Sequence, residues 1–263
     1  MKNYAIEELE QMMRENNGSI RLDGSDVTSL PDNLTVWGDL RLSYTDIAVL
    51  PDNLMVKGYL DLSGTLVTSL PNNLIVEDSL YLSYTPIISL PEDFEVGGCL
   101  DLEGTHITSL PNNLTVGGCL DLRNTPITTL PGNLTVGGSL YLSNSRVASL
   151  PDNLTVGGGL YLDYARITSL PDNIKVGGGI YLGHSQITSL PNGLTVGGNL
   201  DICHTKITSL PDGLKVHGNL NLKDTPIASL PDNLQVGGWM DLSGTQIASI
   251  PARFLGRGKI YVD

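Results

Sequence analysis

The residues best suited to chemistry in this sequence lie between positions 163 and 204. His184 and His204 are one twenty-residue interval apart, and Cys203, Asp163 and Asp201 stand close to them in number. Imidazole, thiolate and carboxylate groups are the usual ligands of zinc and related metals. Such a site would lie open on a surface without supporting side chains. We therefore expect solvated imidazoles here, with no metal and no other cofactor.

Groupings typical of enzymes do not stand out. The sequence has no Ser-His-Asp or Cys-His arrangement in a recognisable context, and no glycine-rich phosphate motif that leads into a helix. Paired carboxylates such as Asp101 and Asp121 recur, but on an open face without the burial that would tune a pKa. We expect no catalytic residues and no enzymatic activity.

Aromatic residues in the same part of the chain indicate binding. Tyr141, Tyr161 and Tyr181 follow one another at intervals of twenty, with Tyr164 and Arg166 close by. Aromatic side chains flanked by arginine are typical of protein interfaces. Alternatively, the tyrosines only stabilise a sheet as cross-strand pairs, each pair contributing ~0.2–1 kcal/mol. The predicted partner-binding residues are Tyr141, Tyr161, Asp163, Tyr164, Arg166, Tyr181, His184, Asp201 and His204.

A repeat of twenty residues positions these side chains. It runs from about residue 20 to the end, and one clear copy spans residues 130–149. A fixed period of this length predicts a solenoid. Each copy contains an apolar pair such as Leu40 and Leu42, whose alternation buries one face of a strand. The residue between the pair then points outward, which places the three tyrosines on one exposed face.

The remaining repeat positions predict turns. Three residues after each apolar pair stands a small hydroxyl residue such as Thr45, whose side chain we expect to bond to the backbone; Ala165 interrupts this series. Proline recurs at every twentieth position from Pro31 to Pro251 and favours an extended or turn geometry. We expect Gly-Gly pairs, such as 97–98, to occupy a tight turn with positive φ.

These patterns predict a mainly β fold. We expect a right-handed β-solenoid with about 12 to 13 coils of 20 residues, each made of two short strands, as a single domain over residues 19–263. Residues 3–16 carry apolar side chains at helical spacing and end near an Asn-Asn-Gly C-cap. The segment 1–18 is therefore predicted as an N-terminal capping helix, and a partner-binding or targeting helix is the alternative.

The segment 60–71, Leu-Asp-Leu-Ser-Gly-Thr-Leu-Val-Thr-Ser-Leu-Pro, resembles a leucine-rich repeat. Its twenty-residue period and Leu-Pro step are most similar to the short bacterial repeats of effectors of the YopM and IpaH type. The chain departs from them by having Thr or Ser in place of Asn, Val-Gly-Gly in place of the second half-repeat, and no domain after the repeats. The resemblance implies a curved solenoid that binds proteins and does not support a ligase. A flat β-helix is the structural alternative.

The net charge of the chain limits the kinds of partner that it can bind. The net charge is −13 and the pI is near 4.5, which disfavours direct binding to nucleic acid or to an anionic membrane. No apolar run approaches the roughly 18 residues needed to span a bilayer, and the acidic first residues do not resemble a secretion signal. We expect a cytoplasmic protein, or one delivered into a host cell by a non-classical route.

The function that we predict from the sequence is a protein–protein interaction scaffold, which binds a partner protein through the exposed face of its parallel sheet. An effector or inhibitor of bacterial or phage origin fits this pattern. One alternative is an acidic mimic of nucleic acid that inhibits a DNA- or RNA-binding protein; another is a structural spacer or surface-fibre segment. The strand expected at 260–262 would have an exposed edge, through which copies could associate end to end.

Overall fold

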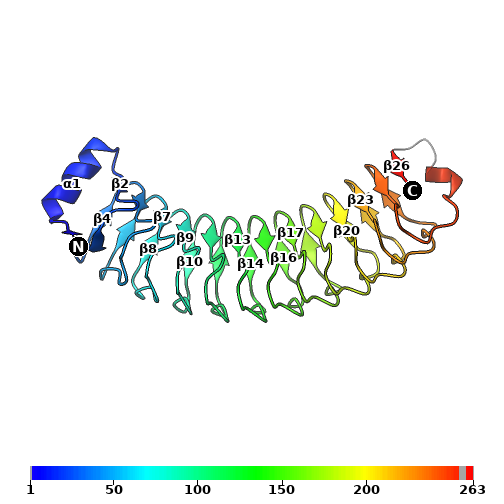
Figure 1. The fold of residues 1–263 in the computed structure, drawn as a ribbon, viewed down its shortest axis with the longest axis horizontal. Helices are drawn as coiled ribbons and strands as arrows, with labels where there is room; N and C mark the ends of the chain where they lie inside the picture. Colours follow the sequence, from blue (N-terminus) through cyan, green and yellow to red (C-terminus); the bar gives the residue numbers. More distant parts are fainter. Residues whose placement is uncertain (1, 255–258, 263) are drawn as a thin grey trace. The chain divides into compact units, whose positions relative to one another are not determined.

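The computed structural model describes residues 2–254 and 259–262. The chain divides into two compact units, and each is a parallel β-solenoid in which every coil contributes short strands (Figure 1). Unit 1 comprises Met1–Ile127 and Asn133–Gly138, and unit 2 comprises Thr128–Gly132 and Ser139–Asp263. The predicted solenoid of twenty-residue coils, with a short helix near the N-terminus, is confirmed.

Unit 1 is built around one main sheet. Its strands pair in parallel in sequence order with a register of one coil, so that Leu40 lies beside Leu60 and Arg41 beside Asp61. The main strands are β2 (Ile20–Arg21), β5 (Leu40–Arg41), β7 (Leu60–Asp61), β9 (Leu80–Tyr81), β11 (Leu100–Asp101) and β13 (Leu120–Asp121). The second strands of these coils are β4 (Thr35–Val36), β6 (Met55–Val56), β8 (Ile75–Val76), β10 (Glu95–Val96), β12 (Thr115–Val116) and β14 (Thr135–Val136).

Unit 2 repeats this plan. Its main strands are β15 (Leu140–Tyr141), β17 (Leu160–Tyr161), β19 (Ile180–Tyr181), β21 (Leu200–Asp201), β23 (Leu220–Asn221), β25 (Met240–Asp241) and β26 (Ile260–Tyr261). The second strands are β16 (Thr155–Val156), β18 (Lys175–Val176), β20 (Thr195–Val196), β22 (Lys215–Val216) and β24 (Gln235–Val236). A 3₁₀ helix, η1 (Ala252–Phe254), follows the last proline.

The core of each unit consists of stacked aliphatic side chains. Both members of the apolar pair are fully buried in almost every coil, as for Leu60 and Leu62. The residue between them, such as Asp61, is only partly exposed. This alternation confirms the predicted strand pattern, because successive side chains of a strand point to opposite faces.

The N-terminal helix packs on the first coil of unit 1. Helix α1 (Ile6–Glu15) buries Leu9 completely, and its end is closed by the Gly18 N–H, which donates to the Met13 carbonyl at 2.8 Å. Asn17 and Gly18 have positive φ, as the predicted C-cap requires. The helix starts later than predicted, because β1 (Lys2–Asn3) pairs with β3 (Val27–Ser29) instead.

The Gly-Gly pairs do not have positive φ, so that prediction was wrong. Their backbones lie directly on the coil before them. A Cβ atom built on Gly117 would meet the Gly97 carbonyl oxygen at 2.1 Å, and one on Gly178 would meet backbone atoms of residues 158 and 159 at 2.8–2.9 Å. In these coils glycine permits the close approach of consecutive backbones, whereas other coils hold Trp37, Lys57, Glu77–Asp78 or His217 at the corner.

Besides some residues of the corner after proline, such as Asn53 and Gly193, positive φ occurs in the turn that leaves each main strand from β2 to β25. We call its third residue the left-handed column; its members are Gly24, Tyr44, Gly64, Tyr84, Gly104 and Asn124 in unit 1 and Asn144, Tyr164, His184, His204, Asp224 and Gly244 in unit 2. Their φ angles lie between 55° and 67°. The turn is closed by backbone bonds such as Thr45 N–H to the Leu42 carbonyl at 3.3 Å. This is the geometry of a type II turn, which favours Gly or Asn at the third residue.

The residue after the left-handed column is the predicted hydroxyl. Each threonine there donates its Oγ1 proton to the carbonyl at the end of the strand, at 2.6–2.7 Å, as Thr45 does to Leu42 and Thr205 to Ile202. The prediction is confirmed for threonine. It is wrong for Ser145 and Ser185, whose buried hydroxyl oxygens have no hydrogen-bond partner within the described part of the chain.

An amide ladder runs along the corner after proline in unit 1. Asn53 donates its side-chain proton to the Asn33 side chain at 2.8 Å, and Asn73 donates to Asn53 at 2.6 Å. The chain therefore has an asparagine ladder, but at a different repeat position from that of the leucine-rich-repeat pattern.

No helix within residues 2–254 and 259–262 has the length and apolar character to cross a membrane.

Candidate partner-binding face

Three tyrosines of unit 2 form a continuous stack. Strands β15, β17 and β19 pair in register, which places Tyr141, Tyr161 and Tyr181 side by side. Consecutive ring centroids are 4.6 Å apart, with interplanar angles of 15° and 4°. We call this row the tyrosine ladder. Its rings are half-buried, and stacked pairs at this spacing each stabilise the fold by about 0.5–1.5 kcal/mol beyond their area.

Two glycines make room for the ladder. Gly159 and Gly179 precede the strands of Tyr161 and Tyr181 by one residue, and each is buried. A Cβ atom on either glycine would lie 2.9 Å from the Cε2 atom of the following tyrosine. The glycine triplets at 157–159 and 177–179 are the sequence signal of this fit, and sequence reasoning missed it.

A second stack lies in the turns that leave the same strands. Tyr164 and His184 stack with ring centroids 4.6 Å apart, and His184 and His204 stack at 4.3 Å. We call this row the turn stack. The sequence placed the two histidines one period apart but did not predict that they stack on each other or on Tyr164.

All three residues of the turn stack have positive φ. The angles are 59° for Tyr164, 58° for His184 and 55° for His204, and all three side chains are exposed. A side chain beyond glycine costs free energy in this conformation, and a tyrosine there is uncommon. Seven other coils place Gly, Asn or Asp at this position and two place Tyr44 and Tyr84, so the turn itself does not require an aromatic ring.

Asp163 and Cys203 lie between the two rows, and Asp201 stands at the end of the ladder row. Asp163 accepts a hydrogen bond from the Gly183 N–H at 3.1 Å, and Asp201 accepts one from the Cys203 N–H at 3.0 Å. Gly183 leaves a notch here: a Cβ atom on it would lie 3.1 Å from both Asp163 Oδ1 and Cys203 Sγ. The side chains of Asp163 and Cys203 therefore border the same small space.

The electrostatics of this space disfavour negative charge. Burial is the main cause that raises the pKa of Asp163, and the Asp201 carboxylate adds to it. Burial, together with the hydrogen bond and negative charge of Asp201, raises the pKa of Cys203 to about 12. A cation placed here would relieve both effects.

The donor atoms include a set that can bind a metal. One ligand atom each from His184, Cys203 and His204 lies within 4.8 Å of the other two. Asp224 stands next to this set, with its Oδ2 atom 3.5 Å from Nε2 of His204. The evidence for a metal site is the short distance between these ligand atoms. The sequence alone did not provide these distances.

The predicted site residues thus fall into three groups. The tyrosine ladder and the turn stack are two rows, and Asp163 and Asp201 lie next to them on the same coils. Tyr181 pairs in register with Asp201, which continues the row of the ladder. Arg166 lies two residues beyond the turn stack and is exposed.

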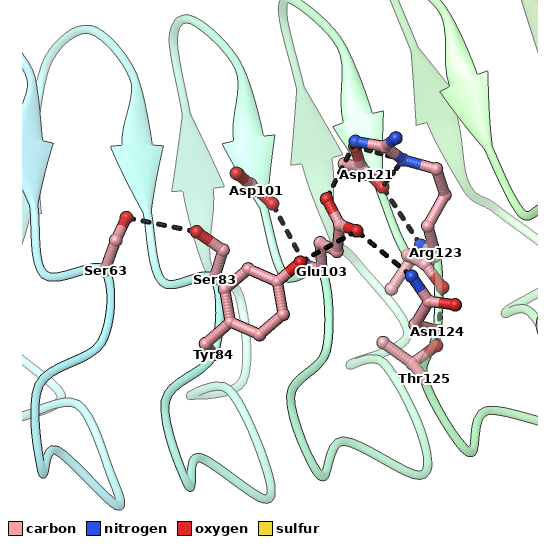
Figure 2. Close-up of polar contacts among 10 residues, drawn as sticks. Ser63, Ser83, Tyr84, Asp101, Glu103, Asp121, Arg123, Asn124 and Thr125 are labelled. Carbon is pink, nitrogen blue, oxygen red and sulfur yellow. Dashed lines mark hydrogen bonds and ion pairs between the residues drawn. The ribbon is translucent and has the colours of Figure 1, made fainter.

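Unit 1 carries a charged network at the equivalent positions (Figure 2). Arg123 binds Asp121 through Nη2 at 2.6 Å and Glu103 at 2.8 Å. Glu103 also accepts hydrogen bonds from Tyr84 Oη at 3.2 Å and Asn124 Nδ2 at 3.0 Å. Asp101 accepts the Glu103 N–H at 2.9 Å. Sequence reasoning missed this network because its contacts between coils, which join residues 19 to 21 positions apart, follow only from the coil register.

Asp101→Asn is expected to raise the free energy of unfolding at about pH 7. Burial chiefly raises the pKa of Asp101, with Asp121 and Glu103 adding to it, so the folded state favours the protonated acid. The stability that Asp101 contributes is then complete below the unfolded-state pKa of about 3.9 and is lost as the pH rises through the folded-state value. Asparagine keeps the oxygen that accepts the Glu103 N–H and removes the charge.

The measurement is urea unfolding of both proteins at about pH 4 and about pH 7, with the larger gain expected at the higher pH. Asp241→Asn is the matched control, because Asp241 accepts the equivalent N–H from Ser243 at 3.0 Å but has Asn221 and Tyr261 as strand neighbours. An equal gain in both variants would contradict the role of the acidic neighbours.

Hollows in unit 2 lie elsewhere. One of about 400 Å³ is bordered by Lys215, His217, Arg253 and Phe254, and one of about 500 Å³ lies along strands β16, β18 and β20. Their walls do not include the predicted site residues, which occupy a surface and not a pocket.

Stacked parallel strands, a leucine core and a twenty-residue period define this chain as a leucine-rich-repeat solenoid. Searches against protein families and curated proteins found no match. The fold is nevertheless similar to solved structures. YopM from Yersinia pestis, a leucine-rich effector protein, matches with a TM-score of 0.57 and 18% identity over 93% of this chain and 71% of that one.

Two further structures show the same likeness. YopM from Yersinia enterocolitica matches with a TM-score of 0.51 and 20% identity over 94% of this chain, which spans 64% of that protein. The Toll–Spätzle complex of Drosophila matches with a TM-score of 0.55 and 21% identity over 86% of this chain and 36% of the other. At such identities the likeness concerns the fold, and the predicted resemblance to YopM-type repeats is confirmed at that level.

Proposed function

We propose that the chain is a protein-interaction scaffold, and that the tyrosine ladder and turn stack of unit 2 form its contact surface for a partner protein. The surface combines the half-buried ladder tyrosines and carboxylates with the exposed rings of Tyr164, His184 and His204. Interfaces favour such rings because they bury a large area with few rotatable bonds.

The turn stack is the observation that carries this proposal. Tyr164, His184 and His204 hold exposed aromatic rings in a backbone conformation that glycine or asparagine adopts at lower cost. Stacking recovers part of this cost, about 0.5–1.5 kcal/mol for each pair. Rings retained at a strained and exposed position indicate a role in recognition.

The structural relatives support a binding role in general terms. The Toll–Spätzle structure is, by its name, a complex, and YopM is described as a leucine-rich effector protein. These descriptions apply to those proteins. They make a partner protein the reasonable first ligand to seek for this chain.

Replacing the tyrosine ladder is expected to abolish partner capture. The variant Tyr141→Ser, Tyr161→Ser, Tyr181→Ser removes the stacked rings but leaves the buried leucines in place. Tyr164→Asn removes one ring of the turn stack and suits the left-handed turn better. Full-length protein and both variants would be immobilised and used to capture partners from cell lysate, with bound proteins identified by mass spectrometry.

Two variants in unit 1 serve as matched controls. Tyr81→Ser removes a tyrosine from a main strand, and Tyr44→Asn removes an exposed tyrosine from the left-handed column. Both should retain the partner that the unit 2 variants lose. Retention of the same partner by all variants would contradict the proposed surface, once circular dichroism shows that each remains folded.

The salt dependence of capture tests the acidic alternative. A partner held by the aromatic face should remain bound when salt is raised, because apolar contacts are not screened. Steep release by salt of a nucleic-acid-binding protein would favour a mimic of nucleic acid instead. The net charge of −13 is the observation that favours the nucleic-acid mimic as a second candidate function.

A further inference from the structure

One cluster in unit 2 has donors that a contact surface for proteins does not require. His184, Cys203 and His204 come from two consecutive coils, and their ligand atoms lie within 4.8 Å of one another. The histidine rings are exposed, whereas Cys203 is half-buried. Two imidazoles and a thiol are borderline to soft ligands, which suit zinc and its neighbours and not calcium or magnesium.

The distances are close to those of a metal site. Zinc binds nitrogen at about 2.0–2.1 Å and sulfur at about 2.3 Å, so tetrahedral ligands lie about 3.4–3.8 Å from one another. Atoms within 4.8 Å of one another need to approach by only about 1 Å. Rotation of the exposed imidazoles about their side-chain bonds supplies this movement, and the backbone of the two coils can stay in place.

The surroundings supply the negative charge and the space that a cation needs. Asp201 lies two residues before Cys203 and accepts its N–H, and the buried Gly183 leaves the notch between Asp163 Oδ1 and Cys203 Sγ open. A side chain at residue 183 would fill that notch. Asp224 can hold one ring nitrogen of His204 and thereby direct the other to the ion, as carboxylates beside metal-binding histidines commonly do.

We propose that His184, Cys203 and His204 bind a divalent cation of the zinc class, with a fourth position open to water or to a ligand atom of a partner. The Cys203 thiol loses its proton to solvent as the metal–sulfur bond forms. The ion offsets the crowding of Asp163, Asp201 and Asp224 around the thiol. It also takes His184 and His204 out of the parallel stacked arrangement. The site shares His184 and His204 with the proposed contact surface, but metal binding does not require a partner protein.

Cobalt(II) titration of the reduced full-length chain tests the site directly. Tetrahedral cobalt bound to a thiolate should give intense d–d bands and a sulfur-to-cobalt charge-transfer band, both of which zinc should remove on competition. Cys203→Ser is expected to abolish the charge-transfer band. His184→Asn and His204→Asn keep a side chain suited to positive φ and are each expected to weaken cobalt and zinc binding by about tenfold or more.

Control variants remove the same groups outside the cluster. Cys119→Ser and His106→Asn change a thiol and an exposed imidazole of unit 1, and both should bind cobalt like the unchanged chain. Circular dichroism would establish that all five variants are folded. A charge-transfer band that persists in Cys203→Ser, or equal affinity in the cluster and control variants, would overturn the site. So would the lack of any cobalt spectrum in the unchanged chain.

These outcomes are separate from those of partner capture. The ladder and Tyr164→Asn variants keep all three proposed ligands and should bind cobalt normally, even if they lose the partner. The His184→Asn variant should lose cobalt whether or not a partner is found. If the metal site is disproved, the partner-binding surface can still be tested by capture, and the metal site can still be tested by cobalt binding if no partner is found.

Discussion

Leu60→Ala is expected to lower the free energy of unfolding by about 3–4 kcal/mol. Leu60 is fully buried in β7, and its neighbours in register, Leu40 and Leu80, are fully buried as well. The substitution removes three carbon atoms from a stack whose members are fixed by the coils on both sides. The backbone of β7 pairs with two strands and cannot collapse into the cavity, so the cost should lie well above the loss of transfer free energy alone.

Leu66→Ala is the matched control, because it makes the same chemical change in the same coil. Leu66 is 53% exposed, so its truncation should change stability by no more than about 0.5 kcal/mol. Urea unfolding followed by circular dichroism measures both variants. A cost for Leu66→Ala equal to that for Leu60→Ala would contradict the assignment of the core.

Gly178→Ala is expected to be almost as harmful, at about 3 kcal/mol. The added Cβ atom would lie 2.8–2.9 Å from the Gly158 carbonyl carbon and oxygen and the Gly159 nitrogen. All three are backbone atoms, so no side-chain rotation relieves the contact. The two coils must separate locally, which lengthens the bond from the Gly178 N–H to the Gly158 carbonyl, now 2.8 Å.

Gly132→Ala provides the contrasting case. Gly132 lies in the corner after proline, its φ is not positive, and an added Cβ atom would meet nothing within 4 Å. Alanine there restricts the unfolded chain and should leave stability unchanged or raise it by about 0.4–1 kcal/mol. Thermal unfolding of both variants would show whether close coil contact, and not loss of glycine as such, causes the effect. A stable Gly178→Ala protein would contradict that explanation.

Much of the fold could be predicted because each core position of the repeat recurs with the same kind of residue in many copies. Alternating leucines set the strand faces, and the invariant proline excluded a helix at the corner. The Gly-Gly pair was interpreted wrongly for a specific reason: a sequence shows that glycine is needed, but not whether φ or a neighbouring coil requires it. Gly117 is needed because the backbone of Gly97 lies against it, and this contact follows only from the stacked coils.

The candidate site was less predictable, since it depends on side-chain orientation. The period placed Tyr141, Tyr161 and Tyr181 on one face, but their stacking depends on Gly159 and Gly179. Likewise, the twenty-residue separation of His184 and His204 in the sequence does not show that the Cys203 side chain lies close to both rings. The strained turn was missed entirely, because Tyr and His at residues 164, 184 and 204, like Tyr44 and Tyr84, concealed a position that Gly, Asn and Asp occupy in the other coils.

The residues of the left-handed column can vary independently of the buried leucines that stabilise the fold. Its turn accepts glycine, asparagine, aspartate, tyrosine and histidine while the adjoining leucines stay buried. Each coil therefore has one position in the left-handed column whose side chain can be substituted without altering the scaffold. A substitution in this row changes one side chain of one coil, and the residues now present show that the turn holds side chains of very different chemistry. An engineer can use the same row to install a chosen series of side chains at the spacing of one coil.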